Sequence, residues 1–157
     1  MTTFRDVRVD DPAAHRLIAD YFAMRAETFP PTLGEYTPKF PTPVDFMPPT
    51  GVFLLVVDGG EDIGCGGVRR VDGAAGNGVR FEVKHLWIDP RAQGRGLGRA
   101  LLAELERRAV ELGATELVLD TNASLTAAGA LYRSSGYTNI PPYNDNPNAT
   151  DWFAKTI

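Results

Sequence analysis

"WIDPRAQGRGLGRALLAELE", residues 87 to 106, is the stretch on which the interpretation of the whole chain depends. It places three glycines and three arginines between an apolar segment and a run of leucines at helical spacing. Glycine at alternate positions lowers helix propensity, so the part before Leu97 is expected to be a turn that leads into a helix. Free N–H groups at the start of a helix bind anions, and arginines add positive charge. We therefore interpret this stretch as an anion-binding loop.

Composition limits the class of protein. The chain has 157 residues, with 43% hydrophobic and 23% charged residues, which predicts a single globular domain over residues 1–157. Its net charge of −4 argues against a general nucleic-acid binder, because such proteins normally carry a basic face. Cys65 is the only cysteine, which excludes an internal disulfide and is typical of a reducing cytoplasm. No secretory signal and no membrane-spanning run is recognised, so we expect a cytoplasmic protein that does not contact membranes.

Hydrophobic periodicity predicts an α/β protein of the α+β type, with a mixed, mainly antiparallel sheet and helices on both faces. Residues 28 to 51 hold seven of the twelve prolines and are expected to form a long ordered loop or lid. The expected strands are 3–9, 52–57, 63–71, 79–88, 115–120, 137–140 and 152–157, and the expected helices are 12–27, the segment from Leu97 to Leu112, and 124–134.

Three kinds of anion-binding loop compete for the glycine-rich segment. A P-loop ends in Lys followed by Ser or Thr, and the segment has no lysine. A Rossmann fingerprint fits better, because a strand, a glycine turn, a helix, a second strand and a terminal acid, Asp120, follow in order. However, the spacing of Gly94, Gly96 and Gly98 places Arg99 where that fold packs a small residue, and no second mononucleotide half follows. A pyrophosphate bound at a helix N-terminus is the remaining interpretation.

Two motifs make this interpretation specific. Residues 91 to 96, "RAQGRG", follow an apolar strand and "DP", and they resemble the acetyl-CoA pyrophosphate loop of the GNAT superfamily of N-acetyltransferases. Further on, "LVLDT" (117–121) and "AAGALYRSSGY" (127–137) resemble the second cofactor region of that superfamily. The two motifs occur in the family's order and spacing and cover roughly residues 52 to 140. The resemblance implies a GNAT-like fold with acetyl-CoA as the acetyl donor.

The resemblance also implies where the cofactor binds. A bulged strand at about Leu86 to Ile88 would offer backbone N–H groups to the pantetheine and thioester, and the glycine loop would bind the pyrophosphate. Many family members carry an asparagine where this chain has Leu125; either Asn122 replaces it or that contact is absent. Two histidines and one cysteine leave no metal-ligand spacing, so no metal is expected. The implied cofactor residues are Leu86, Trp87, Ile88, Arg91, Gln93, Gly94, Arg95, Gly96, Leu97, Gly98, Arg99 and Asn122.

Two residues are candidates for acid–base catalysis. Glu82 resembles the strand glutamate that acts as general base in some GNAT enzymes; the alternative is an ion pair with Lys84, which shares its face of a regular strand. Tyr132 matches the family tyrosine that donates a proton to the leaving sulfur; the alternative is a core aromatic residue. Cys65 and His85 are expected to have packing roles.

The function predicted from these motifs is a direct, ternary-complex transfer of acetyl from acetyl-CoA to a primary amine. The alternative is a module that binds acyl-CoA as a sensor or partner domain without turnover; a dinucleotide-binding oxidoreductase is a weaker third interpretation. A small-molecule amine with an apolar part is the expected acceptor, although a basic peptide or polyamine also fits the acidic surface, and a homodimer is left open. The acceptor wall, whose residues could equally pack the lid, is expected to comprise Phe29, Tyr36, Phe40, Phe46, Tyr143 and Trp152.

Overall fold

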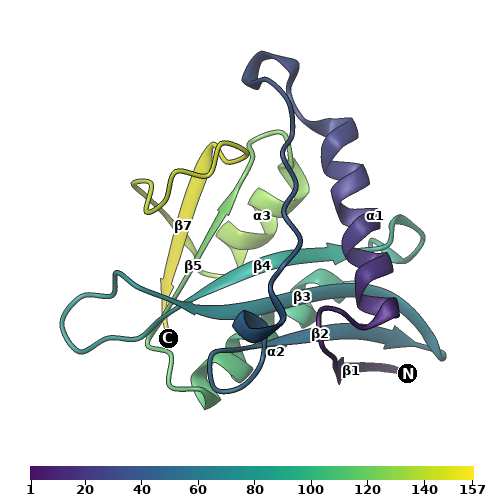
Figure 1. Ribbon diagram of the computed structural model, residues 1–157, viewed down its shortest axis with the longest axis horizontal. Coiled ribbons are helices and arrows are strands. Elements are labelled where there is room, and N and C mark those ends of the chain that lie inside the picture. The colour runs from purple at the N-terminus through teal and green to yellow at the C-terminus, as the bar shows by residue number, and fades with distance from the viewer.

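The computed structural model describes residues 1–157 and contains one seven-stranded sheet (Figure 1). The strands lie in the order β1-β2-β3-β4-β5-β7-β6. Every neighbouring pair is antiparallel except β4 and β5, which are parallel and are joined through α2. This mixed, mainly antiparallel sheet is the one that the periodicity predicts. The strands are β1 (Thr2–Asp6), β2 (Gly51–Asp58), β3 (Glu61–Val71), β4 (Arg80–Ile88), β5 (Glu116–Thr121), β6 (Thr138–Ile140) and β7 (Asp151–Thr156).

Helices cover both faces of the sheet (Figure 1). Alternate residues of β2 point to opposite faces, so Leu54 packs with the leucines of α2 (Leu97–Glu111), whereas Phe53 and Leu55 pack under α1 (Pro12–Thr28). Tyr132 of α3 (Thr126–Ser134) packs into the same core, on the face of the sheet that α2 covers. Two separate hydrophobic cores therefore hold the sheet between its helices, and the prediction of helices on both faces is confirmed.

The helix boundaries follow from local sequence. Asp11 caps α1 by accepting a hydrogen bond from the N–H of Ala13 at 2.9 Å, and Pro12 occupies the first helical position. Helix α2 ends at Gly113, whose φ of 97° is the left-handed conformation that a glycine after a helix adopts. Glu104 and Arg108 pair across one turn on the wet side of α2, at 2.8 Å.

Glycines in β3 let both layers approach the sheet closely. A Cβ on Gly67 would lie 2.7 Å from the rings of Phe46 and Phe53, and a Cβ on Gly66 would lie 3.1 Å from Leu105 of α2. Cys65 directly precedes these glycines and is fully buried, in the packing role that its surroundings predict. Burial raises the pKa of its thiol, which keeps the group protonated and unreactive.

Three details differ from the sequence prediction or refine it. Strand β1 ends at Asp6 rather than at Val9, because the chain turns at residues 9–11 to enter α1. The proline-rich segment crosses in front of the sheet (Figure 1) and contains two short 3-10 helices, Pro31–Leu33 and Pro43–Phe46. None of the helices combines the length and the apolar character that crossing a bilayer requires.

Candidate active site

The site forms where β4 and β5 separate. Their parallel pairing extends only from Arg80 to Glu82 on β4, so the strands diverge beyond that point. On the other edge of β4, Cys65 pairs with Trp87 but Gly67 pairs with Lys84, so His85 and Leu86 together oppose Gly66 alone. This is a β-bulge, and the φ of +57° at His85 belongs to it. The bulge implied for about Leu86 to Ile88 therefore starts one residue earlier.

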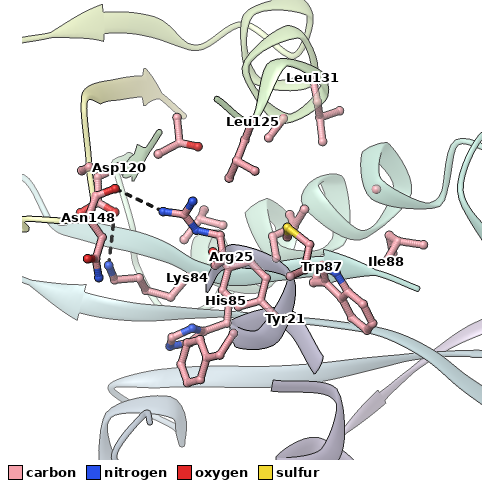
Figure 2. Close-up of a pocket in the computed structure, with 18 of the residues that line it drawn as sticks. Tyr21, Arg25, Lys84, His85, Trp87, Ile88, Asp120, Leu125, Leu131 and Asn148 are labelled. Atoms are coloured by element: carbon pink, nitrogen blue, oxygen red, sulfur yellow. Dashed lines mark hydrogen bonds and ion pairs between the residues drawn. The ribbon is translucent and has the colours of Figure 1, made fainter. Parts of the chain in front are cut away.

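A cavity of about 1340 Å³ opens from this split. It is larger than a typical small-molecule pocket, so it can hold a donor and an acceptor together. It reaches from α1 and the proline-rich segment at one end to the glycine loop at the other. Figure 2 shows this arrangement, with Arg25, Asp120 and Asn148 toward one end and Ile88 and Leu131 toward the other.

Unpaired backbone donors surround the glycine loop. None of the N–H groups of residues 94 to 99 donates a hydrogen bond within the protein; the next donor, Ala100, bonds the carbonyl of Gly96 at 3.0 Å. Gly94 and Gly96 have φ of 79° and 75°, a left-handed conformation that other residues adopt only under strain. Gln93 Nε2 donates to the carbonyl of Ile88 at 3.0 Å, which fixes the loop to the end of β4. The start of α2 is therefore an anion site in the sense that the sequence predicts.

The three arginines of the loop have different partners, and one of them lines the cavity. Arg99 lines the cavity and donates to the hydroxyls of Ser134 and Ser135. Arg91 pairs with Asp89 at 2.9 Å, and the pKa of that carboxyl is lowered by this guanidinium. Arg95 pairs with Asp58 at 2.8 Å. Arg91 and Arg95 do not line the cavity, so their cofactor contacts stay a prediction. The other loop and strand candidates line it: Leu86, Trp87, Ile88, Gln93, Gly94, Gly96, Leu97 and Gly98.

Asn122 lies beside the cavity and not in its wall. Its Oδ1 accepts from the N–H of Ser124 at 3.0 Å, and its Nδ2 donates to the carbonyl of Asn148 at 3.2 Å. The side chain of Asn148 in turn bonds Thr37 of the proline-rich segment through both its oxygen and its nitrogen. Asn122 is thus linked through Asn148 to the proline-rich segment, which lines the α1 end of the cavity. Whether Asn122 takes the place of the family asparagine, where this chain has Leu125, stays a prediction.

Tyr132 of α3 lines the cavity, and its hydroxyl makes no hydrogen bond within the protein. Its ring packs against Tyr137 and Phe153 with centroids 6.0 Å apart in each case. Burial, with a smaller contribution from the negative charge of Asp120, raises the pKa of Tyr132 to about 12. The phenol therefore keeps its proton at neutral pH and can donate it to a group in the cavity.

Glu82 is buried, with 1% of its surface exposed, but it does not line the cavity. Its partner is Arg69, directly opposite on β3, whose Nη2 lies 2.9 Å from Oε1. The hydroxyl of Tyr143 donates to Oε2 at 2.6 Å, and burial together with the charge of Glu82 raises the pKa of that phenol. The ion pair expected with Lys84 is a longer contact of 4.0 Å.

Three charged residues that the sequence did not single out for the site converge at the α1 end of the cavity (Figure 2). Asp120 is the second-last residue of β5, where it accepts from Lys84 Nζ at 3.4 Å and from Asn144 Nδ2 at 2.7 Å. Arg25 belongs to the last turn of α1 and is 4% exposed. Its position is four residues after Tyr21 and seven after Ile18, on the apolar stripe of the helix, and a cation on such a stripe is the signal that could have revealed it.

His85 packs its ring against three aromatic rings, those of Tyr21, Phe22 and Phe46, at centroid distances of 5.6 to 6.1 Å. Burial, helped by the positive charges of Lys84 and Arg69, lowers the pKa of His85 from 6.5 to about 3. The imidazole is therefore neutral at physiological pH, in agreement with a packing role.

This shift predicts a pH dependence of stability. Between pH 6.5 and about 3 the unfolded chain binds a proton at His85 that the folded chain does not, so the free energy of unfolding falls as pH decreases. His85→Asn, which tolerates positive φ and does not titrate, should remove this part of the dependence. Urea unfolding of both proteins from pH 7 down to pH 5 measures it. If the free energy of unfolding changed with pH in the same way for wild type and variant, His85 would be as easily protonated in the folded protein as in the unfolded chain.

Comparisons with known proteins agree with this geometry. Residues 7–137 match the model of the Acetyltransferase (GNAT) family. An uncharacterized N-acetyltransferase of Schizosaccharomyces pombe is 35% identical over 103 residues, which are 65% of this chain and 61% of that protein. The chain thus spans less than two thirds of the length of these curated relatives, which include an IAA acetyltransferase of Azospirillum brasilense.

Solved structures resemble nearly the whole chain. The structure of a presumed acyl-CoA N-acyltransferase from Klebsiella pneumoniae superposes with a TM-score of 0.74 at 30% identity, covering 99% of this chain and 97% of that one. A GNAT family acetyltransferase from Elizabethkingia anophelis with acetyl-CoA bound has a TM-score of 0.65 at 16% identity, covering 99% and 98%. The second likeness concerns the fold alone.

Proposed function

Because the chain belongs to the Acetyltransferase (GNAT) family, which uses acetyl-CoA, we propose that it transfers an acetyl group from acetyl-CoA to a primary amine in a ternary complex. The single observation that carries the proposal is the run of unpaired N–H groups at residues 94 to 99, at one end of a cavity with charged groups at the other. We further propose that residues 1–157 act as one cytoplasmic domain and that the acceptor is a small molecule.

The residues present fit acetyl-CoA. The unpaired N–H groups and Arg99 suit the pyrophosphate, because both contribute positive potential at the start of α2. The split between β4 and β5 gives the pantetheine a place beside Leu86, Trp87 and Ile88. When bound, the cofactor supplies the thioester whose acetyl group is transferred.

Tyr132 is the proposed acid. When the amine nitrogen bonds the acetyl carbon and the carbon–sulfur bond breaks, the sulfur requires a proton. The Tyr132 hydroxyl has no competing hydrogen bond, and its raised pKa keeps it protonated until the sulfur leaves.

Asp120 is the proposed base. It is one of two carboxylates in the cavity wall; the other, Asp45, is 47% exposed and lies near Arg69, whereas the Asp120 side chain is 6% exposed. Glu82 is proposed to act on Asp120 only through Lys84, because the Lys84 ammonium lies between the two acids, 3.4 Å from Asp120 and 4.0 Å from Glu82. Asp120 would take the proton that the amine loses as its nitrogen bonds the acetyl carbon.

Isosteric substitutions separate the two acids. Asp120→Asn should lower kcat/KM at pH 7 by roughly a hundred- to ten-thousand-fold, the usual contribution of a general base, and higher pH should restore part of the rate as the free amine becomes neutral. Glu82→Gln should lower it by less than about ten-fold, because the change leaves the cavity wall intact. Initial rates from pH 6 to 10 measure both. A larger loss of kcat/KM in Glu82→Gln than in Asp120→Asn would instead make Glu82 the base, as its resemblance to the strand glutamate implies.

Release of the free thiol from acetyl-CoA, with a panel of primary amines, tests the proposed function. An enzyme releases the thiol only when an acceptor is present, and the acetylated amine appears in equal amount. A sensor or partner module would bind acetyl-CoA, as measured by calorimetry, and release no thiol with any amine. That outcome would replace the proposed enzyme by the alternative predicted from the sequence.

A further inference from the structure

Arg25 has unused binding capacity inside the cavity. One terminal nitrogen, Nη2, donates to the backbone carbonyl of Asn148 at 3.2 Å. The other, Nη1, is buried and has no hydrogen-bond partner. No carboxylate of the chain forms an ion pair with this guanidinium, whereas Arg69 and Lys84, also in the cavity wall, each have a nearby acid. Arg99 and Lys39 line the cavity without such a partner. Arg25 is thus a buried cation without a counterion.

The surroundings offset only part of the cost of burying this charge. The guanidinium carbon lies 5.1 Å from the ring centroid of Tyr36 and 5.9 Å from that of Phe29, distances at which aromatic faces attract cations. Such contacts are weaker than a hydrogen-bonded ion pair, and they do not satisfy the N–H groups of Nη1. A buried arginine of this kind is suited to a ligand that brings the missing negative charge.

We propose that the acceptor is an amine that also carries a carboxylate, and that Arg25 binds this carboxylate. The inference rests on the proposed function, because it assigns the acceptor of that reaction. Asp120 lines the same end of the cavity (Figure 2) and would receive the amine, while Arg25 receives the acid group. An amino acid presents these two groups of opposite charge a short distance apart.

Two features favour a single carboxylate over a phosphate. Lys84 is already paired with Asp120, and Lys39, which also lines this end of the cavity, is exposed to solvent. Arg25 is therefore the one buried positive charge that is left to neutralise. The unpaired donors at the glycine loop, which suit phosphate, lie at the opposite end of the cavity. The wall near Arg25 is aromatic, with Tyr21, Phe22 and Tyr36, so the side chain of the acceptor is expected to be apolar.

Matched acceptors test the proposal directly. L-Phenylalanine, L-leucine and L-methionine are compared with their carboxamides, which keep the amine and the side chain but lose the negative charge. We expect kcat/KM to be roughly ten- to a hundred-fold higher for each acid than for its amide, the scale of a charged hydrogen bond. Arg25→Gln should abolish this preference by raising KM for the acids, and Arg25→Lys should restore part of it. Arg16→Gln, on the same helix but with half its side chain in solvent, should keep the full preference.

A binding measurement separates this inference from the proposed function. L-Phenylalanine, L-leucine and L-methionine are each titrated into the protein by calorimetry in the presence of coenzyme A, where no turnover occurs. Binding to wild type that Arg25→Gln abolishes would support the carboxylate site even if no amine were acetylated. Equal kcat/KM for acids and amides in wild type, or a preference that survives Arg25→Gln, would overturn the inference while leaving acetyl transfer standing. Failure of L-phenylalanine, L-leucine and L-methionine all to bind would overturn it as well.

Discussion

Gly96→Glu should weaken the binding of acetyl-CoA by roughly a hundred-fold or more, because it places a negative charge where the pyrophosphate is proposed to lie. A Cβ at Gly96 would meet nothing within 4 Å, so the new side chain would extend into the space beside the unpaired N–H groups. The left-handed φ of 75° adds strain of about 1 to 2 kcal/mol for any residue with a Cβ. Calorimetric titration with acetyl-CoA measures the loss of affinity.

Gly60→Glu is the matched control for this variant. Gly60 also has a left-handed φ, 83°, and also faces open space, but it lies in the turn between β2 and β3 and does not line the cavity. The same charge and similar strain are therefore introduced away from the site, and the affinity for acetyl-CoA should stay within about two-fold of wild type. Unchanged affinity in a folded Gly96→Glu protein would rule out the glycine loop as the pyrophosphate site.

Tyr132→Phe should lower kcat by roughly ten- to a thousand-fold, the scale of one acid–base contribution, and leave the affinity for acetyl-CoA nearly unchanged. The variant removes only the hydroxyl, so the ring packing against Tyr137 and Phe153 is kept. Because the hydroxyl makes no hydrogen bond within the protein, its loss leaves no partner unsatisfied. Single-turnover rates and the Kd for acetyl-CoA give the two quantities separately.

Tyr137→Phe provides the comparison, since Tyr137 is a buried neighbour that does not line the cavity and donates to Glu106 at 2.8 Å. Loss of the Tyr137 hydroxyl should lower stability, because Glu106 loses a partly buried hydrogen bond, while kcat stays near wild type. Lost affinity with a normal single-turnover rate in Tyr132→Phe would mean that the tyrosine binds the cofactor and does not protonate the sulfur. A wild-type rate and affinity would make it a core residue.

The order of strands and helices could be predicted because each element carries its own period. Leu101, Leu102 and Leu105 recur at helical spacing and are all buried in α2. In β2, a continuous apolar run is typical of a buried strand, and Phe53 and Leu54 pack into opposite cores. The start of α2 was recognisable because a glycine-rich turn before a helix is a local signal.

The partners of the charged residues could not be predicted in the same way, because they depend on which strands become neighbours. Arg69 faces Glu82 through the register of β3 and β4, and this cross-strand contact outcompetes Lys84, which is closer in sequence. Tyr143 reaches Glu82 from a loop far along the chain. Nothing in the local sequence around Glu82 specifies either contact.

Of the predicted acceptor wall, Tyr36, Phe40 and Phe46 do line the cavity, but the charged residues at its α1 end were missed for a related reason. A lone arginine near the end of a helix is ordinarily explained by the negative end of the helix dipole, so Arg25 attracts no attention by itself. Only the fold shows that the last turn of α1 lies under the proline-rich segment, where Tyr36 and Asn148 enclose the guanidinium. Asp120 was noticed only as the terminal acid of a Rossmann pattern, although its place at the split between β4 and β5 is what brings it into the cavity.

The most direct test of acetyl transfer in this cavity is the mass of the amine after incubation with stoichiometric acetyl-CoA. The wild-type protein should convert at least one primary amine of the panel to a product that carries one additional acetyl group, with one free thiol for each product. Gly96→Glu should form no product over the same period, and Gly60→Glu should match wild type. Thiol release without acetylated amine in wild type, or equal product from Gly96→Glu and wild type, would contradict acetyl transfer at this site.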